Sequence, residues 1–502
     1  MGGEDPLASL DPQQTDGLTD LDAAGFAAAA HEVVDLIADY LARLEGLPVF
    51  PPVEPGTLAP AFPVDAPAGP EPLRMILDDY RRLVEPNATH WQHPGFMAYF
   101  PTSAAAAGML GEMLMTALAQ NPMLWRTSPI GTELETVVVG WLRRGLGLPD
   151  AFDGFLNDTA STSSLIALGA AREAAGMRAA ELGLAARPEL GMPRIYASTE
   201  THSSIDKAAM TLGLGRASVV RLPVDETWAM RTEALLAAIA EDRAAGRRPM
   251  AVVATIGTTS STAVDPVAEI AEIARAEGLW LHVDAAYAGV VALLPERRAL
   301  FAGWEAADSI VVNPHKWLFT PLDASLLLTR RMAVLREAFS LVPEYLRTLD
   351  RDGPVRDVTE YTPQLGRRFR ALKLWVMLRW FGMSGLQRRI DHHLRMAADL
   401  AAAVRAEPGW EVVAPVPFAT LCIRHRPATV AGPPEGPMAE AEADAHNQRI
   451  LDAVNRSGEV FLSHTRLGGR FVIRVALGHL RTEERHVARA WQLLRAAALD
   501  AG

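Results

Sequence analysis

The 502-residue chain has a single cysteine, Cys422, and only three lysines among its 48 basic residues. One cysteine cannot form an intramolecular disulfide or a cysteine-based structural zinc site, so we expect a protein of a reducing compartment, the cytoplasm. Arginine stays protonated in proteins. Chemistry that requires a deprotonatable amine is therefore confined to Lys207, Lys316 and Lys373.

Long apolar runs and a surplus of basic residues are also missing. The longest uncharged apolar stretch, near residues 285–294, has about half the roughly 20 residues that a membrane span needs. The N-terminus has no basic region followed by an apolar one. The formal net charge is −12, whereas nucleic-acid binding needs concentrated Lys and Arg. We therefore expect a globular protein with a small-molecule partner, and neither a membrane nor a nucleic-acid partner.

Residues 1–103 are predicted to form an arm. Apolar residues recur at helical spacing from Phe26 through Leu44, which predicts an amphipathic helix. Nine prolines between Pro48 and Pro72 exclude helix and interior strand and predict an extended segment. Because an amphipathic helix on such a tether cannot bury its apolar face alone, we expect a homodimer.

Residues 104–373 are predicted to form a large α/β domain. Short β-branched segments alternate with segments of helix length, which indicates βαβ units and a mostly parallel sheet. The expected strands are 194–198, 217–222, 251–257, 279–284 and 308–313.

Residues 374–502 are predicted to form a smaller α+β domain. A long helical region comes first, four strand-like segments follow, and a final helix is expected from Thr482 to Leu499. Between these strands, the Pro-, Gly-, Ala- and Glu-rich stretch at 425–446 is expected to be a surface insertion.

Ligands of open parallel sheets bind beyond the carboxyl ends of the strands. One expected strand ends at Asp284, and the next is followed by Asn313 and Lys316. A lysine can form a Schiff base with a carbonyl cofactor, and a buried carboxylate can keep a pyridine nitrogen protonated. This pair predicts pyridoxal 5'-phosphate (PLP) as the cofactor.

Two further segments suit such a cofactor, and each also has a simpler interpretation. Residues 157–164 open a helix with hydroxyl groups and free amides, which attract a phosphate; alternatively, Thr159 or Ser161 only caps that helix. His202 follows the strand at 194–198, where its ring could lie flat on an aromatic cofactor; alternatively, it is a hydrogen-bonded structural histidine.

Several separate motifs together resemble one family. They are NPHKW at 313–317, LHVDAAYAG at 281–289, WQHPGFMAYFPTS at 91–103, SPIGTELE at 128–135 and LGRRFRALKLW at 365–375. In these motifs the chain resembles the PLP-dependent group II amino acid decarboxylases, most closely the aromatic-L-amino-acid decarboxylases. The resemblance runs in the same order along the chain, from about residue 24 to residue 498. The resemblance implies the PLP fold-type I architecture and a homodimer with active sites near the subunit interface.

The resemblance also implies roles for individual residues. Lys316 would be the Schiff-base lysine, Asp284 the partner of the pyridinium nitrogen, and His202 the ring that stacks on PLP. Further cofactor contacts are implied at Thr159, Ala160, Ser161, Thr259, Ala286, Asn313 and His315. Substrate contacts are implied at Trp91, Phe100, Pro101, Thr102, His202 and Gly366.

A loop tyrosine is implied as well. The polar segment 340–363, with Gly353 and Pro354, is typical of a mobile loop that closes over an active site. Tyr345 in this loop resembles the family's proton donor; alternatively, it is a packing aromatic. Relatives that make aldehydes by oxidative decarboxylation change this tyrosine or the stacking histidine, and here both match the simple decarboxylase.

We therefore expect PLP-dependent decarboxylation of an aromatic L-amino acid to an arylalkylamine and CO2. The alternatives are an aldehyde synthase, a transaminase, a decarboxylase of a non-aromatic amino acid, or an inactive protein that keeps the fold. The preferred ring stays open, because Asn121 and Met123, which would reach the neighbouring subunit's pocket, depart from the animal enzymes.

The remaining candidates have structural interpretations. Lys207 and Lys373 are expected on helices, with the charge of Lys373 in solvent. No metal is expected from the two histidine pairs in the sequence: the first pair lacks a nearby third ligand, and the adjacent histidines of the second point apart on a helix. These pairs are His90 with His93, and His392 with His393.

Overall fold

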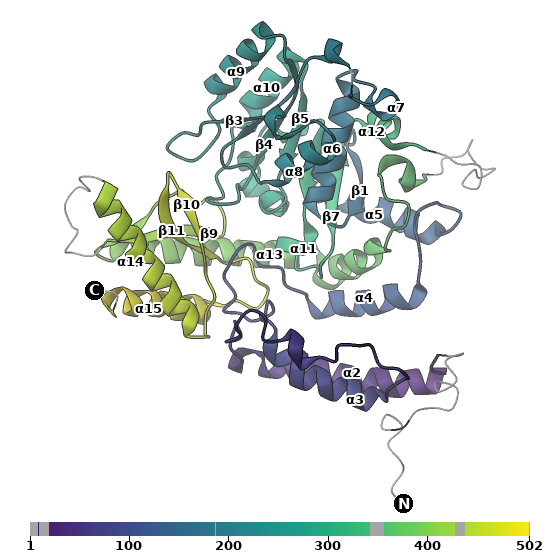
Figure 1. Ribbon diagram of the computed structural model, residues 1–502, viewed down its shortest axis with the longest axis vertical. Coiled ribbons are helices and arrows are strands. Elements are labelled where there is room, and N and C mark those ends of the chain that lie inside the picture. The colour runs from purple at the N-terminus through teal and green to yellow at the C-terminus, as the bar shows by residue number, and fades with distance from the viewer. Residues whose placement is uncertain (1–8, 10–19, 186, 342–355, 427–436, 501–502) are drawn as a thin grey trace, which may run out of the picture.

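The computed structural model describes residues 9, 20–185, 187–341, 356–426 and 437–500. An N-terminal arm, a large α/β domain and a smaller α+β domain are visible in Figure 1. Within these residues, no helix is long and apolar enough to cross a membrane.

The large domain is built on a seven-stranded sheet with the strand order β1-β7-β6-β5-β4-β2-β3. The strands are β1 (Asp153–Asn157), β2 (Pro193–Ser198), β3 (Val219–Leu222), β4 (Arg248–Thr255), β5 (Trp280–Asp284), β6 (Ser309–Val312) and β7 (Ser325–Thr329). The predicted mostly parallel sheet and its five predicted strands are confirmed. The sequence analysis missed β1 and β7, which pair with each other antiparallel at one side of the sheet. Because only the short helix α11 (Pro314–Trp317) and a loop separate β6 from β7, β7 lacks the βαβ spacing.

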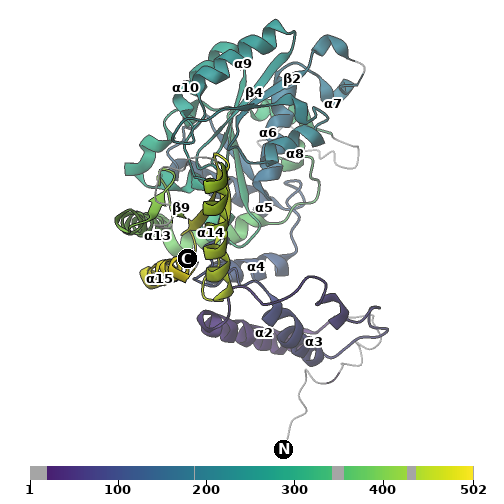
Figure 2. The same cartoon turned by 60° about the vertical axis from the view of Figure 1, so that its left-hand side comes forward.

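Helices cover both faces of this sheet, as Figures 1 and 2 show. On one side lie α6 (Ala160–Ala174) and α8 (Ser204–Thr211), and on the other α9 (Thr232–Ala244) and α10 (Val267–Glu277). In β2, Ile195 and Ala197 enter the core beneath α6 and α8, whereas Tyr196 enters the core on the opposite face. This period of two is that of a strand buried on both faces.

The arm contains the predicted amphipathic helix as α2 (Ala23–Arg43), followed after a long irregular segment by α3 (Leu73–Asp79). Glu32 of α2 pairs with Arg74 Nη1 of α3 at 2.6 Å and with Arg81 Nη2, in the turn just after α3, at 3.2 Å. Within α2 only Ala29 is buried, while Phe26 is 60% exposed. The apolar face of the arm therefore stays largely uncovered in the single chain.

The small domain has a four-stranded antiparallel sheet with the order β10-β11-β9-β8. Its elements are α13 (Arg370–Ala406), β8 (Trp410–Val412), β9 (Thr420–His425), α14 (Pro437–Arg456), β10 (Ser463–Leu467), β11 (Arg470–Ala476) and α15 (Glu484–Asp500). The predicted boundary at residue 373 falls inside α13, whose backbone leaves helical geometry at Gly382 (φ 60°). The predicted insertion at 425–446 is wrong for residues 437–446, because these belong to α14. Their Ala and Glu residues are strong helix formers.

Candidate active site

A cavity of about 430 Å³ lies where β2, β4, β5 and β6 end. It is closed by Tyr99 and Phe100 from the end of the arm and by side chains of β10 and β11. The structure brings most of the predicted residues together here. The predicted residues that line the cavity are Phe100, Thr159, Ala160, Ser161, His202, Thr259, Asp284, Ala286, Asn313, His315 and Lys316.

Lys316 and Asp284 reach this cavity from neighbouring strands. Asp284 ends β5, is 6% exposed, and accepts a hydrogen bond from the Ala286 N–H at 3.1 Å. Lys316 lies on α11, directly after β6. Burial lowers the pKa of Lys316, and the charge of Asp284 opposes this shift while that of Arg474 adds to it. A lowered pKa increases the neutral fraction of the amine, which is the nucleophilic form.

His202 follows β2, and its ring lines the same cavity. Its Nδ1 accepts a hydrogen bond from the Ser204 N–H at 3.1 Å, so the neutral ring carries its hydrogen on Nε2. Partial burial lowers the pKa of His202, while Asp284 opposes the shift. The side chain is therefore a neutral ring at physiological pH and adds no positive charge to the cavity.

Asn313 and His315 form a polar pair at the end of β6. Nδ1 of His315 accepts from the Ala324 N–H at 2.9 Å, and burial lowers the pKa of His315 to about 3. The neutral ring then carries its hydrogen on Nε2, 3.2 Å from the Asn313 amide. Only the amide oxygen can accept this hydrogen. We therefore assign the Asn313 oxygen to His315, which leaves its NH2 group free to donate to an anion.

The N-terminus of α6 supplies further donors. Thr159 is the N-cap residue, yet its side chain makes no capping hydrogen bond, so the alternative that Thr159 only caps this helix is wrong. Asp158 Oδ1 instead accepts from the Thr159 N–H at 2.7 Å. The N–H groups of the first helical turn lack partners within the helix, and an anion bound in the cavity would satisfy them.

Arg474 of β11 was missed from the sequence. Its side chain is buried, its Nε donates to the Ser260 carbonyl at 3.0 Å, and its Nη1 donates to the Tyr99 carbonyl. Nη2 is buried without a partner. The guanidinium lies 4.4 Å from the centroid of the Phe100 ring. The signal in the sequence was a lone arginine in the apolar run 471–476, because burying a cation is costly unless it is paired or binds a ligand.

Stacked rings form the floor beneath these groups. Phe100 stacks on Tyr287 with centroids 3.8 Å apart, and Tyr287 stacks on Trp317 at 4.7 Å. Trp317 Nε1 donates to His393 Nδ1 at 2.8 Å. The column fixes Phe100, whose centroid also lies 5.0 Å from Lys316 Nζ. Lys316 and Arg474 therefore contact one and the same ring.

The two other lysines lie elsewhere. Lys207 is exposed on α8. The prediction that the charge of Lys373 is solvated is wrong: its side chain is fully buried and pairs with Glu112 of α4 (Ala106–Leu118). Burial lowers the pKa of Lys373 and the hydrogen bond to Glu112 raises it. An ion pair satisfies this lysine, so neither rival competes with Lys316.

Some predicted residues do not line the cavity of the single chain. Trp91 stacks on Phe96 at 4.2 Å and is 38% exposed. Pro101 and Thr102 continue past Phe100 without entering the lining, and Gly366 faces open space. Their substrate contacts stay predictions. Tyr345 lies outside the described residues.

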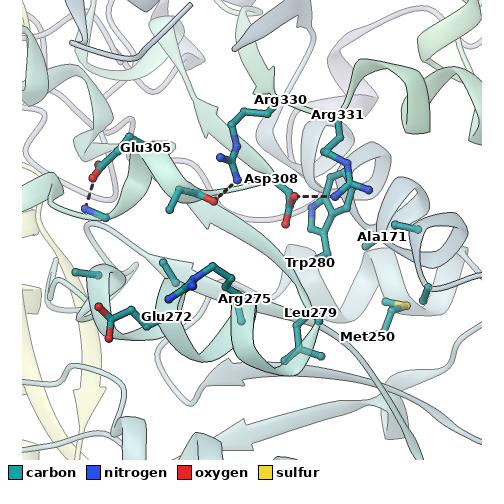
Figure 3. Close-up of a pocket in the computed structure, with 18 of the residues that line it drawn as sticks. Ala171, Met250, Glu272, Arg275, Leu279, Trp280, Glu305, Asp308, Arg330 and Arg331 are labelled. Atoms are coloured by element: carbon teal, nitrogen blue, oxygen red, sulfur yellow. Dashed lines mark hydrogen bonds and ion pairs between the residues drawn. The ribbon is translucent and has the colours of Figure 1, made fainter. Parts of the chain in front are cut away.

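A larger hollow of about 680 Å³ lies at the other end of the central strands, beside the first residue of β5 (Figure 3). Arg331 pairs there with Asp308 at 3.2 Å, and Arg330 Nε donates to the Ala307 carbonyl at 2.8 Å. Among the described residues around it there is no lysine and no predicted site residue. The amine chemistry therefore belongs to the smaller cavity.

The smaller cavity fits PLP by the chemistry of its side chains. Lys316 would link to the aldehyde, Asp284 would face the ring nitrogen, and the α6 N-terminus with the free Asn313 NH2 would hold the phosphate. The buried, unpartnered amide atom of Asn313 is an observation that calls for such a ligand. When bound, PLP supplies the carbonyl that captures an amine and the ring that accepts an electron pair.

Comparisons with known proteins agree with this fit. The model of the pyridoxal-dependent decarboxylase conserved domain matches residues 55–426. Phenylacetaldehyde synthase of Arabidopsis thaliana is 39% identical over 474 residues, 93% of this chain and 94% of that protein. Aromatic-L-amino-acid decarboxylase of Sus scrofa is 38% identical over 491 residues, 96% and 97% of the two chains. The crystal structure of Oryza sativa TDC with PLP and tryptamine superposes with a TM-score of 0.91 at 36% identity, covering 96% and 99%.

Replacing Lys316 tests the assignment of the reactive amine. Lys316→Ala should abolish the visible absorption of covalently held cofactor, because neither Lys207 nor Lys373 lines the cavity. Lys207→Ala, which removes an exposed amine, should keep it. Borohydride reduction followed by peptide mass spectrometry locates the attachment. Covalent cofactor retained in Lys316→Ala would disprove the assignment.

Proposed function

The chain belongs to the pyridoxal-dependent decarboxylase family and uses PLP, and we propose that it decarboxylates an aromatic L-amino acid to the corresponding arylalkylamine and CO2. The observation that carries this proposal is the placement of Lys316 and Arg474 against one ring, that of Phe100. An α-amino acid presents an amine and a carboxylate on one carbon. A reactive amine and a buried, incompletely bonded arginine near the same ring suit both groups.

The active-site residues have separate roles in this reaction. Arg474 Nη2 binds the substrate carboxylate, since a charged hydrogen bond formed away from water is stronger than one in solvent. His202 would stack on the bound cofactor as a neutral ring. Asp284 would keep the ring nitrogen of bound PLP protonated, so that the ring can accept the electron pair that develops at the α-carbon. Tyr345 then donates a proton to the α-carbon, a role that rests on the resemblance of its loop.

An aldehyde synthase is the second candidate. Phenylacetaldehyde synthase of Arabidopsis thaliana is as similar to this chain as the decarboxylases are. Against it stand Tyr345 and His202, which match the simple decarboxylase at the two positions where the aldehyde-forming relatives change.

Product identification tests the proposal directly. The PLP-loaded protein is incubated with an equimolar mixture of L-tryptophan, L-phenylalanine, L-tyrosine, L-DOPA and L-glutamate, and the products are identified by mass. Arylalkylamines are expected, and their order of appearance ranks the substrates. Aldehydes with an equal amount of peroxide would support the second candidate. An amine from glutamate alone would disprove the aromatic specificity.

Tyr345→Phe is expected to shift the product from amine toward aldehyde. Removing the hydroxyl removes the proton donor for the α-carbon, so the unprotonated α-carbon is left open to two-electron oxidation by dissolved oxygen, which is reduced to hydrogen peroxide. The amine-to-aldehyde ratio, measured with peroxide release, should fall by about 100-fold or more, the lower end of a general-acid contribution. An unchanged ratio would leave Tyr345 as a packing residue.

We also propose that the enzyme is a homodimer. Phe26 of α2 and Leu110, Leu114 and Leu118 of α4 are all more than half exposed. Such an uncovered apolar face marks a protein interface.

The predicted substrate-pocket residues that miss this chain's own cavity support the same proposal. The Arg367 N–H, next to Gly366, donates to Asn121 Oδ1 at 2.9 Å. Gly366 and Asn121 therefore sit together outside the cavity of their own chain. A second copy would find them at its pocket.

Leu114→Glu should convert the dimer to a monomer at micromolar concentration, because a buried unpaired carboxylate is costly. Sedimentation velocity measures the mass. Leu182→Glu on α7 (Ala179–Leu182) is the matched control, since Leu182 is 51% exposed and Leu114 55%. A monomeric wild type, or a dimeric Leu114→Glu, would contradict the proposed interface.

The single cysteine supports a reducing compartment, and we propose the cytoplasm as the site of action. Fractionation of the producing cells tests this location.

A further inference from the structure

The loop that follows β4 places Ser260 at the rim of the active-site cavity. Its own hydrogen bonds close the loop: the Gly257 N–H donates to the Ala263 carbonyl at 2.9 Å, and the Thr262 N–H to the Thr258 carbonyl at 3.0 Å. Thr262 holds a left-handed φ of 58°, which the surrounding bonds must stabilise. Ser260 is therefore presented on a well-fixed loop of the large domain.

Three strands of the small domain converge on this one residue. The Ser260 carbonyl accepts from Arg474 Nε of β11 at 3.0 Å and from Cys422 Sγ of β9 at 3.3 Å. Burial raises the pKa of Cys422 to about 12, so the group is a thiol that can donate. The Ser260 hydroxyl lies 2.9 Å from Thr465 Oγ1 of β10.

Glu200 of the large domain is a further partner of Ser260. It follows β2, two residues before His202; burial raises the pKa of its carboxyl group, and a hydrogen bond from the Ser260 side chain opposes this shift. A carboxylate can only accept, so Ser260 donates to Glu200 and accepts from Thr465. One hydroxyl thus joins the loop that carries His202 to the strand beside Arg474.

The orientation of the Arg474 guanidinium depends on its hydrogen bond to the Ser260 carbonyl. Nε is fixed on the Ser260 carbonyl and Nη1 on the Tyr99 carbonyl, which leaves Nη2 as the buried nitrogen without a partner. A guanidinium is planar, so fixing two of its nitrogens fixes the direction of the third. A shift of the Ser260 carbonyl would therefore change the direction in which Nη2 points.

We propose that Ser260 is a positioning residue that aims Arg474 at the substrate carboxylate, held in place by the hydrogen-bond chain from Thr465 through the Ser260 hydroxyl to Glu200. The inference rests on the proposed function, because it takes the ligand of Arg474 to be the carboxylate of an amino acid. It goes beyond that function by assigning the discrimination between carboxylate and neutral ligands to residues outside the arginine itself.

A matched pair of ligands that do not react measures the preference of the site for a carboxylate over a neutral amide, without turnover. 3-Phenylpropanoate and 3-phenylpropanamide differ in the carboxylate alone and have no amine to react with PLP. Their indole counterparts provide a second pair. Calorimetric titration of the PLP-loaded wild type should show the carboxylate binding about 10–100-fold more tightly than the amide, the range of a hydrogen bond to a charged group.

The variants separate positioning from binding. In Arg474→Met the carboxylate preference should disappear. Ser260→Ala and Glu200→Ala should each reduce it about 3–10-fold with amide affinity unchanged, since a misaligned charged bond is weakened and not lost. Ser260→Thr and Glu200→Gln keep a hydroxyl or an acceptor and should restore most of the preference.

A double-mutant cycle makes the claim specific. Ser260→Ala should have no further effect on the carboxylate preference once Arg474→Met is present. Thr232→Val removes a comparable hydroxyl–carboxylate bond, from Thr232 Oγ1 to Glu269 Oε2 at 3.0 Å, far from the cavity. The preference should be unchanged in this control.

The outcomes distinguish a failure of the positioning role of Ser260 from a failure of the proposed function. A wild type with no carboxylate preference for either ring overturns the assignment of Arg474 and, with it, the proposed mode of substrate binding. A preference that is lost in Arg474→Met but intact in Ser260→Ala overturns the positioning role alone. Equal loss of affinity for carboxylate and amide in Ser260→Ala, with a lowered melting temperature, would mean a purely structural role and also overturns it.

Discussion

The parallel register of β5 and β6 determines the geometry of the active site. His282 lies opposite Ser309 and Asp284 opposite Val311. Because side chains alternate between the two faces, a slip by one residue would turn Asp284 away from the cavity. His282 shares the face of Asp284 and binds both Ser309 at 2.9 Å and Ser164 of α6 at 3.2 Å. Burial lowers the pKa of His282 to about 4, so this neutral histidine fixes the strand register together with α6, whose N-terminus lines the cavity.

The charge of the cavity lining is opposite in sign to the net charge of the whole chain. The protein carries a formal net charge of −12, yet Lys316 and Arg474 face a single carboxylate, Asp284, among the ionised groups that line the described cavity. His202 and His315 stay neutral because burial lowers the pKa of each. A small positive excess in a partly desolvated space attracts anions strongly. Both a phosphate and a substrate carboxylate are anions.

The sequence predicted those parts of the site that follow a strand directly. Asp284, Lys316 and His202 stand at strand ends, where position along the chain implies position in space. Arg474 was missed because it reaches the cavity from within a strand of the small domain, and only tertiary packing brings that strand near β4. Lys373 was misjudged for the same reason: its partner Glu112 lies on another helix, and helical spacing alone does not identify a buried ion pair.

Closure of the cavity depends on all three parts of the chain. Tyr99, at the end of the arm, has a left-handed φ of 52° and is held through its N–H by Ser463 and through its carbonyl by Arg474. Phe100 is thereby pressed onto Tyr287 of the large domain. Such a strained backbone persists only where its surroundings over-determine it. The contacts that hold this strain are the same ones that bring Arg474 to Lys316, so the recognition of an amino acid emerges only when arm, sheet and small domain have assembled.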